Sequence, residues 1–200
     1  MDKRYNIDFI DSEIDMLYEL FGIRKNIETY KYLDWIIDQD YDSVLNNMAK
    51  IFNLPIKFIP EIFDPIVNDR TKIAEVYIPP GLPTIGSPLL QGYKIRIRLS
   101  KSILFHPDVI MLTLAHEISH VFFEVVQYKN KRNEKSVDLC ALIFGFRELS
   151  QRARKTSYQQ SRINQDFRMI NTFGYLSDEE YENAVIRINY LLEKHRNQEI

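Results

Sequence analysis

The residues best suited to chemistry lie in one short run, His116-Glu117-Ile118-Ser119-His120. On a helix, residues four positions apart lie on the same side, so the two imidazoles face one another with the glutamate beside them. This HExxH spacing is the arrangement in which two histidines bind zinc and the glutamate acts as a general base. The alternative is a hydrogen-bonded histidine in a core. Two histidines and a glutamate on one buried face fit that alternative poorly.

The helix that carries this run, residues 111–126, is apolar on nearly every side, which predicts a helix inside the fold. Only Ser119 lies outside the polar sector. At about 100° per residue, the other polar side chains fall within one sector roughly 100° wide: Thr113, His116, Glu117, His120 and Glu124. Burying such a stripe costs on the order of several kcal/mol per charged group unless partners compensate. We therefore expect a partner, best supplied by a metal ion, against it.

A catalytic zinc with two histidine ligands needs a third protein ligand, because water takes the fourth position. Glu134 and Asp138 are the candidates, since the short polar turn at 127–132 lets the next helix return antiparallel. We expect Glu134 to bind the metal and Asp138 to accept the second ring N–H of His116, which fixes the tautomer of that ligand. The alternative is a pair of solvated acids, which the first turn of a helix also favours.

The two motifs together resemble those of a known group of enzymes. The run HEISH at 116–120, followed by NEKSVD at 133–138, is similar to the HExxH…NExxxD pattern of gluzincin metallopeptidases. The short spacing and small size are closer to the ImmA/IrrE family of small intracellular metallopeptidases. The likeness covers roughly residues 93–146. It departs from the family at Val137, where alanine is usual, and the N-terminal helix-turn-helix of some members is not evident.

The resemblance implies a fold, a cofactor and an activity. The fold would be α+β, a mostly helical zincin-like domain with a small, about three-stranded sheet packed on the active-site helix. Zinc would be held by His116, His120 and Glu134, with Glu117 as the general base and Asp138 supporting the first histidine. The family implies cleavage of an intracellular regulatory protein, often a transcriptional repressor, although fold and motif alone do not determine a substrate.

Two questions stay open in the sequence. A non-catalytic or conditionally inactive regulatory module that keeps the metal site is the alternative function. The absence of cysteine near the motif and the presence of only four histidines favour an open, catalytic site over a closed, structural one. A group that stabilises the transition-state oxyanion is also expected, and the sequence leaves four candidates for it: Tyr175, Tyr158, Tyr128 and His195.

Composition sets the remaining expectations. The net charge of −2 gives no reason to expect direct nucleic-acid or membrane binding. The N-terminus lacks the apolar run of a secretory signal, so a cytoplasmic protein is expected. Cys140 is the single cysteine, which rules out an internal disulfide and predicts a buried thiol. We expect one metallopeptidase domain over residues 1–200, with a helical subregion at 1–53 and the sheet, site and C-terminal helices at 54–200.

Apolar spacing predicts three helices in the N-terminal part: 7–21, 26–37 and 43–52, the last with Ser43 as its N-cap. Three short strands are expected after them: 56–59, closed by Pro60, then 72–78, and 93–99 beyond a long Pro- and Gly-rich loop. The strand at 93–99 alternates apolar and basic residues. Such charges are typical of an exposed edge strand, which could bind a peptide by strand addition.

The C-terminal part is predicted to be helical. Pro107 opens the metal-binding helix, and the following helix is expected from 133 through 146 and as far as 154. Another helix is expected at 160–172. Ser177 and Glu180 have the spacing of a capping box and predict the start of the last helix.

Overall fold

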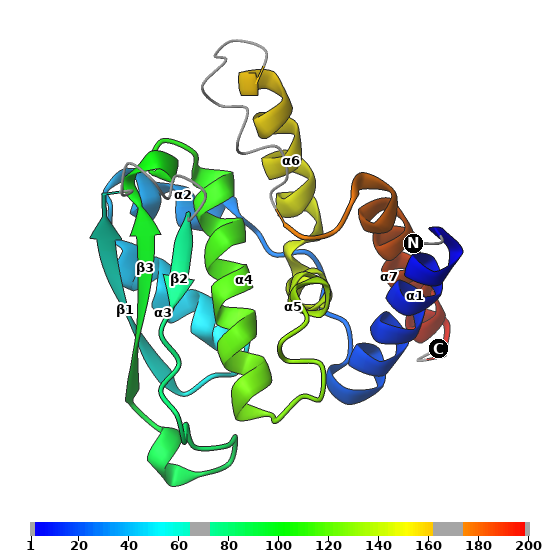
Figure 1. Ribbon diagram of the computed structural model, residues 1–200, viewed down its shortest axis with the longest axis horizontal. Helices are drawn as coiled ribbons and strands as arrows, with labels where there is room; N and C mark the ends of the chain where they lie inside the picture. Colours follow the sequence, from blue (N-terminus) through cyan, green and yellow to red (C-terminus); the bar gives the residue numbers. More distant parts are fainter. Residues whose placement is uncertain (1–2, 65–72, 162–173, 199–200) are drawn as a thin grey trace.

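The computed structural model describes residues 3–64, 73–161 and 174–198 and has an α+β fold with a small three-stranded sheet, as predicted (Figure 1). Its elements are α1 (Lys3–Phe21), α2 (Tyr30–Ile37), α3 (Tyr41–Ile51), β1 (Ile56–Phe63), β2 (Ala74–Val76), β3 (Tyr93–Ser100), α4 (Pro107–Val125), α5 (Glu134–Ala141), α6 (Arg147–Ser161) and α7 (Asp178–Gln198). Short 3-10 turns lie at Pro88–Leu90 and Lys101–Ile103, and a π-helical turn spans Leu142–Phe146.

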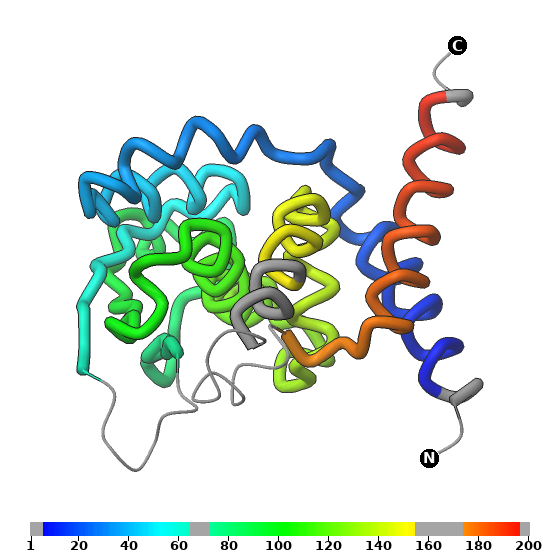
Figure 2. The backbone as a smooth tube through the Cα atoms, turned by 90° about the horizontal axis from the view of Figure 1, so that it is seen from above, coloured from blue at the N-terminus to red at the C-terminus, as the bar shows by residue number. Residues whose placement is uncertain are grey.

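The elements follow one another across the molecule, with α4 between the sheet and α5 and with α1 and α7 beyond α5 (Figure 1). The three N-terminal helices are divided between the two ends. Helices α2 and α3 pack near the sheet and α4, whereas α1 lies side by side with α7, as Figure 2 also shows. One cluster of buried apolar side chains runs through all these layers, from Ile14 of α1 through Phe58 and Phe123 to Ile188 of α7.

The sheet has the order β1-β3-β2, so β3 is its central strand, parallel to β1 and antiparallel to β2. The predicted alternation along β3 is confirmed, because Ile95, Ile97 and Leu99 are buried, Tyr93 is half-buried and the basic residues are exposed. The prediction that this strand is an edge was wrong. Arg96 and Arg98 instead form ion pairs with Glu61 of β1, and Arg98 also pairs with Glu75 of β2. The sequence of a strand does not distinguish basic residues that pair with acidic residues of neighbouring strands from basic residues on an exposed edge strand.

Pro60 does not close β1, which continues to Phe63 in register with β3. The strand lies at the edge of the sheet, and an edge strand tolerates a residue that lacks an N–H donor. The strand predicted at 72–78 is shorter in the structure, where β2 spans only Ala74–Val76; residue 72 lies outside the described residues.

Three helix starts differ from their predictions. Helix α1 begins at Lys3 rather than 7. Helix α2 begins at Tyr30 rather than 26, because the amides of Arg24 and Ile27 donate to the carbonyls of Ile143 and Gly145. That pairing holds the chain before α2 out of a helix. Helix α3 is capped by Asp40 rather than Ser43, since the Asp40 carboxylate accepts the Ser43 amide at 3.1 Å.

The predictions for the C-terminal helices are partly confirmed. Pro107 is the first residue of α4, and Ser177 and Glu180 form the capping box of α7, with reciprocal bonds of 3.2 and 2.8 Å. The helix predicted from 133 through 146 and towards 154 is broken, because α5 ends at Ala141 and Gly145 has a φ of 100°. The helix predicted at 160–172 falls almost entirely outside the described residues.

Gly145→Ala is expected to lower the free energy of unfolding by about 2–4 kcal/mol. The left-handed φ disfavours a side chain, and an added Cβ would lie 2.3 Å from the Lys25 carbonyl oxygen. Denaturant unfolding of the purified protein measures the loss. Gly92→Ala is the matched control, since its φ is +71° and nothing lies within 4 Å of an added Cβ; equal losses in the two variants would contradict the role given to the close contact.

Candidate metal centre

Helix α4 is the buried helix that the sequence predicted. Most of its residues are buried, and Ser119, the polar residue outside the stripe, donates to the carbonyl of Ala115 at 2.8 Å. The chain then turns into α5, which packs against α4. The antiparallel return expected for this helix was wrong, because α5 crosses α4 and is seen end-on beside it in Figure 1. The side chain of Asn133 caps α5 by accepting the amides of Lys135 and Ser136. This cap places Glu134 in the first turn of α5, opposite the histidines.

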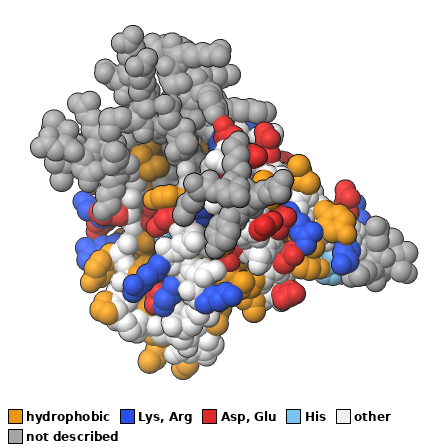
Figure 3. Space-filling model, turned by 45° about the vertical axis from the view of Figure 1, so that its right-hand side comes forward, with side chains coloured by type: hydrophobic (Ala, Val, Ile, Leu, Met, Phe, Trp, Pro, Cys, Tyr) orange, Lys and Arg blue, Asp and Glu red, His pale blue; other side chains and the backbone are white. Residues whose placement is uncertain are grey.

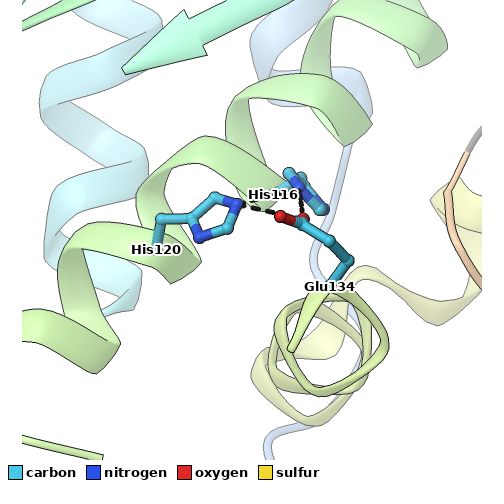
Figure 4. A group of neighbouring side chains, drawn as sticks. All are labelled: His116, His120 and Glu134. Carbon is cyan, nitrogen blue, oxygen red and sulfur yellow. Dashed lines mark hydrogen bonds and ion pairs between the residues drawn. The ribbon is translucent and has the colours of Figure 1, made fainter. Parts of the chain in front are cut away.

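Three ligand atoms meet between the two helices: His116 Nε2, His120 Nε2 and Glu134 Oε2 (Figure 4). We call them the ligand triangle, since each of its sides measures 3.2 Å. Ligand atoms bound to one tetrahedral zinc at about 2.05 Å would lie about 3.3 Å apart. The three side chains therefore fit a metal ion of that size. Glu134 Oε2 is buried, and both imidazole Nε2 atoms lie 3.2 Å from it.

Asp138 supports the first histidine as predicted, with its Oδ1 2.8 Å from His116 Nδ1. A carboxylate only accepts hydrogen bonds, so Nδ1 carries the proton and donates it. In a neutral imidazole this leaves the lone pair on Nε2, the atom that belongs to the ligand triangle. Asp138 thus selects the tautomer in which His116 can bind a metal.

The charges around the triangle favour a cation there. Burial alone would lower the pKa of His116, but its bonds to Asp138 and Glu134 outweigh burial and raise the pKa to about 10. Burial and the neighbouring His116 lower the pKa of His120, and the bond to His116 lowers that of Glu134 despite its partial burial. Without metal, the imidazole of His116 is therefore charged and carries a second ring proton on Nε2, the atom that would bind a metal ion.

Glu117 lies beside the triangle and contributes no atom to it. Burial raises the pKa of its carboxyl, the charge of His116 opposes that rise, and the charge of Glu134 adds to it. Its carboxylate also receives a hydrogen bond from the backbone of Val76 in β2. A buried, non-ligating carboxylate with a raised pKa is suited to taking up and releasing a proton.

Comparisons of the chain with protein-family models, with curated proteins and with solved structures gave no match. The assignment of the site therefore depends on its own geometry. Cys140 is a buried free thiol, as expected. None of the described helices has the length and apolar character needed to cross a membrane.

Of the four candidates for stabilising an oxyanion, Tyr175 lies at the site. Its ring stacks on His116 with centroids 5.6 Å apart. Tyr128 instead donates to the buried carboxylate of Glu13, and His195 lies against Tyr18 of α1. The side chain of Tyr158 lies outside the described residues. Burial raises the pKa of Tyr175 and the nearby carboxylates add to that rise, so its hydroxyl stays protonated and can donate.

Sequence reasoning missed the backbone groups at the site. Tyr175 and Leu176 donate their amides to Asp138 Oδ2, and the backbone of Val76 reaches Glu117. Every residue except proline has the same backbone N–H group, so the sequence does not show which of these groups lie at the site. The only signal available was Gly174, which directly precedes the two donors and has a φ of +97°.

Zinc affinity is expected to rise by about tenfold per pH unit between pH 6.5 and pH 9. The raised pKa of about 10 keeps His116 protonated in the metal-free protein, so a metal ion must displace that proton. As the pH rises towards this pKa, the proton competes less with the metal ion for His116. As the pH falls, the proton competes more strongly. Competition with a chromophoric chelator, calibrated at each pH without protein, measures the dissociation constant. An affinity that does not change over this range would contradict the assignment of the proton.

Proposed function

We propose that the chain is a zinc-dependent endopeptidase that cleaves an intracellular regulatory protein. The observation that carries the proposal is the ligand triangle with the non-ligating carboxylate of Glu117 beside it. Two imidazole nitrogens and one carboxylate oxygen are a common donor set of catalytic zinc. The likeness of the HEISH and NEKSVD runs to the ImmA/IrrE family supports the same assignment and suggests zinc, a cytoplasmic location and a repressor-like substrate.

The number of ligands favours catalysis over a structural role. Structural zinc sites are closed by four protein side chains, whereas catalytic sites keep one position open. Within the described ranges, three metal-ligating residues gather at the site. This supports a peptidase rather than a regulatory module that uses the metal only for stability.

The residues around the triangle have separate roles in the proposed reaction. Bound zinc supplies a Lewis acid that lowers the pKa of water and polarises the scissile carbonyl. Glu117 takes the proton of the attacking water and passes it to the leaving amine nitrogen. The raised pKa of Glu117 suits both transfers. Tyr175, protonated and beside His116, is the candidate donor to the oxyanion.

Among the described residues, β2 pairs with another strand only on its β3 side, and its outer edge is suited to holding an extended peptide. Tyr77 donates its amide to the carbonyl of Arg96, and Ser100 donates to that of Ile73, so alternate residues of this strand pair with β3. Val76 lies between these residues, so its backbone N–H and C=O point away from β3. Its backbone forms a hydrogen bond with Glu117 on α4. A peptide added to this edge would lie beside the triangle. We therefore propose β2, rather than the strand at 93–99, as the strand to which a peptide substrate adds.

The proposed substrate is a protein rather than a nucleic acid. On the face shown in Figure 3, basic and acidic side chains of the described residues are interspersed. The balanced composition agrees with that distribution. Nucleic-acid binding normally needs basic side chains clustered on one face. The proposal therefore includes neither direct nucleic-acid binding nor membrane binding.

The test is cleavage by the zinc-loaded full chain. The protein is incubated with a peptide library derived from a whole proteome and with intact transcriptional repressors, and new N-termini are identified by mass spectrometry. Zinc-dependent cuts that the Glu117→Gln variant does not make would support the proposal. Bound zinc without any such cut, in both substrate sets, would favour the non-catalytic alternative.

A further inference from the structure

Residues 174–178, which we call the support segment, lead into α7 and include its first residue, Asp178; they hold Asp138. The amides of Tyr175 and Leu176 donate to Asp138 Oδ2 at 2.5 and 3.3 Å. The other oxygen, Oδ1, accepts the ring N–H of His116. Both oxygens of this carboxylate are therefore engaged, one by the support segment and one by the histidine.

Gly174 allows the carboxylate to approach the backbone so closely. A Cβ built at this position would lie 2.8 Å from Asp138 Oδ2, and the φ of +97° is one that side chains rarely adopt. Any other residue would push the carboxylate away or change the turn. Glycine is therefore needed at position 174 for two reasons, the positive φ and the lack of space for a Cβ beside Asp138.

Arg154 of α6 holds the support segment from the other side. Its guanidinium donates to the carbonyl of Leu176 and to the carboxylate of Asp178, both at 2.8 Å. The Arg154 side chain is 9% exposed and lies over the ring of Tyr181. Arginine can serve both acceptors at once because its donors are fixed in one plane.

A second link ties the support segment to α5. Ser177 and Glu180 form the capping box of α7, and the buried Glu180 also accepts Lys135 Nζ at 2.5 Å. Lys135 directly follows the ligand Glu134. Helix α5, which supplies Glu134 and Asp138, is thereby joined to the start of α7.

We propose that the support segment sets the metal affinity of the site, with Gly174 and Arg154 as positioning residues that act through Asp138. The inference depends on the proposed metal centre and concerns residues that are neither ligands nor in contact with the reacting atoms. Groups that orient a ligand from behind typically change metal affinity 10- to 100-fold when they are lost. Here a series of hydrogen bonds joins Arg154 to the metal site. Arg154 donates to Leu176, the Leu176 amide donates to Asp138, and Asp138 accepts from His116 Nδ1.

The zinc dissociation constants of full-length Gly174→Ala and Arg154→Met test the proposal, measured by competition with a chromophoric chelator. Each variant is expected to bind zinc about 10- to 100-fold more weakly than the parent. Circular dichroism and the unfolding midpoint without metal establish that each variant is folded. Should Gly174→Ala not fold, Arg154→Met, which keeps an apolar side chain over Tyr181, still decides the outcome. Affinities equal to that of the parent would overturn the proposal.

Two matched controls separate positioning from general stability. Gly86→Ala changes a glycine of similar φ, +87°, with nothing within 4 Å of an added Cβ. Arg187→Met removes the ion pair between α7 and Asp15 of α1. Both are expected to keep zinc affinity within about twofold, since neither touches Asp138. Losses in the controls as large as those in the test variants would overturn the proposal.

A double variant shows whether the effect passes through Asp138. In an Asp138→Ala background, Gly174→Ala is expected to cause no further loss of zinc affinity, because the carboxylate that it displaces is gone. A full additional loss would overturn the proposed route. If the parent binds no zinc, the proposed function and this inference both fail. If the parent binds zinc but cleaves nothing, only the proposed function fails, because the affinities are measured without activity.

Discussion

Glu117→Gln is expected to lower kcat/KM for peptide cleavage by about a thousandfold or more while leaving zinc bound. Glutamine has nearly the same shape as glutamate but cannot take the proton of the attacking water. Glu117 contributes no atom to the ligand triangle, so the metal should stay. Zinc content by elemental analysis and cleavage by mass spectrometry, on the same preparation, measure the two effects separately.

Glu124→Gln is the matched control for this substitution. Glu124 lies on the same polar stripe of α4, two helical turns further on, and pairs with Lys131 at 2.9 Å. The change removes the same charge from the same helix and is expected to leave kcat/KM nearly unchanged. Retained cleavage by Glu117→Gln would remove the glutamate from its role as base, and loss of zinc would show that it is a ligand.

His120→Ala is expected to weaken zinc binding by more than about a thousandfold and to abolish cleavage, because two ligands remain of three. The parent should also gain stability from the metal, about 4 kcal/mol when free zinc is a thousand times the dissociation constant. That gain should be absent in the variant. Bound zinc per chain and the unfolding midpoint with and without zinc measure the two effects.

His106→Ala controls for the loss of an imidazole. His106 is the N-cap residue of α4 and does not belong to the ligand triangle. The variant is expected to bind one zinc per chain with nearly the affinity of the parent. Undiminished zinc content in His120→Ala would refute the ligand set, and equal losses in both variants would show a general effect on α4.

The candidate site could be predicted where its spacing is set within one helix or across one short turn. His116, Glu117 and His120 share a face because of helical periodicity alone. Glu134 and Asp138 follow after a short connection and lie one helical turn apart, so one face of α5 presents both to α4, although α5 crosses α4 instead of returning antiparallel. The support segment could not be predicted in this way. Its contacts with Asp138 join residues 37 and 38 positions apart through backbone amides.

The fold was predictable to a similar extent. Element types and the buried face of β3 follow from local pattern, but its central position comes from pairing with β1 and β2. The partners of Arg98 on these strands, Glu61 and Glu75, lie 37 and 23 residues before it. The break between α5 and α6 depends on the segment at 24–27, which pairs with Ile143 and Gly145 from the other end of the chain. A local pattern contains no information about such distant partners.

The support of Asp138 by residues 174–178 has a consequence for the order of events during synthesis. A growing chain that has reached α5 already contains His116, His120 and Glu134, but it lacks the two amides that hold Asp138. The ligands are therefore translated before the residues that support them, and a single domain is expected to fold as a unit. We therefore expect tight metal loading only after residues 174–178 have been translated; under the proposed function, an unfinished chain would then not cleave the proteins around it.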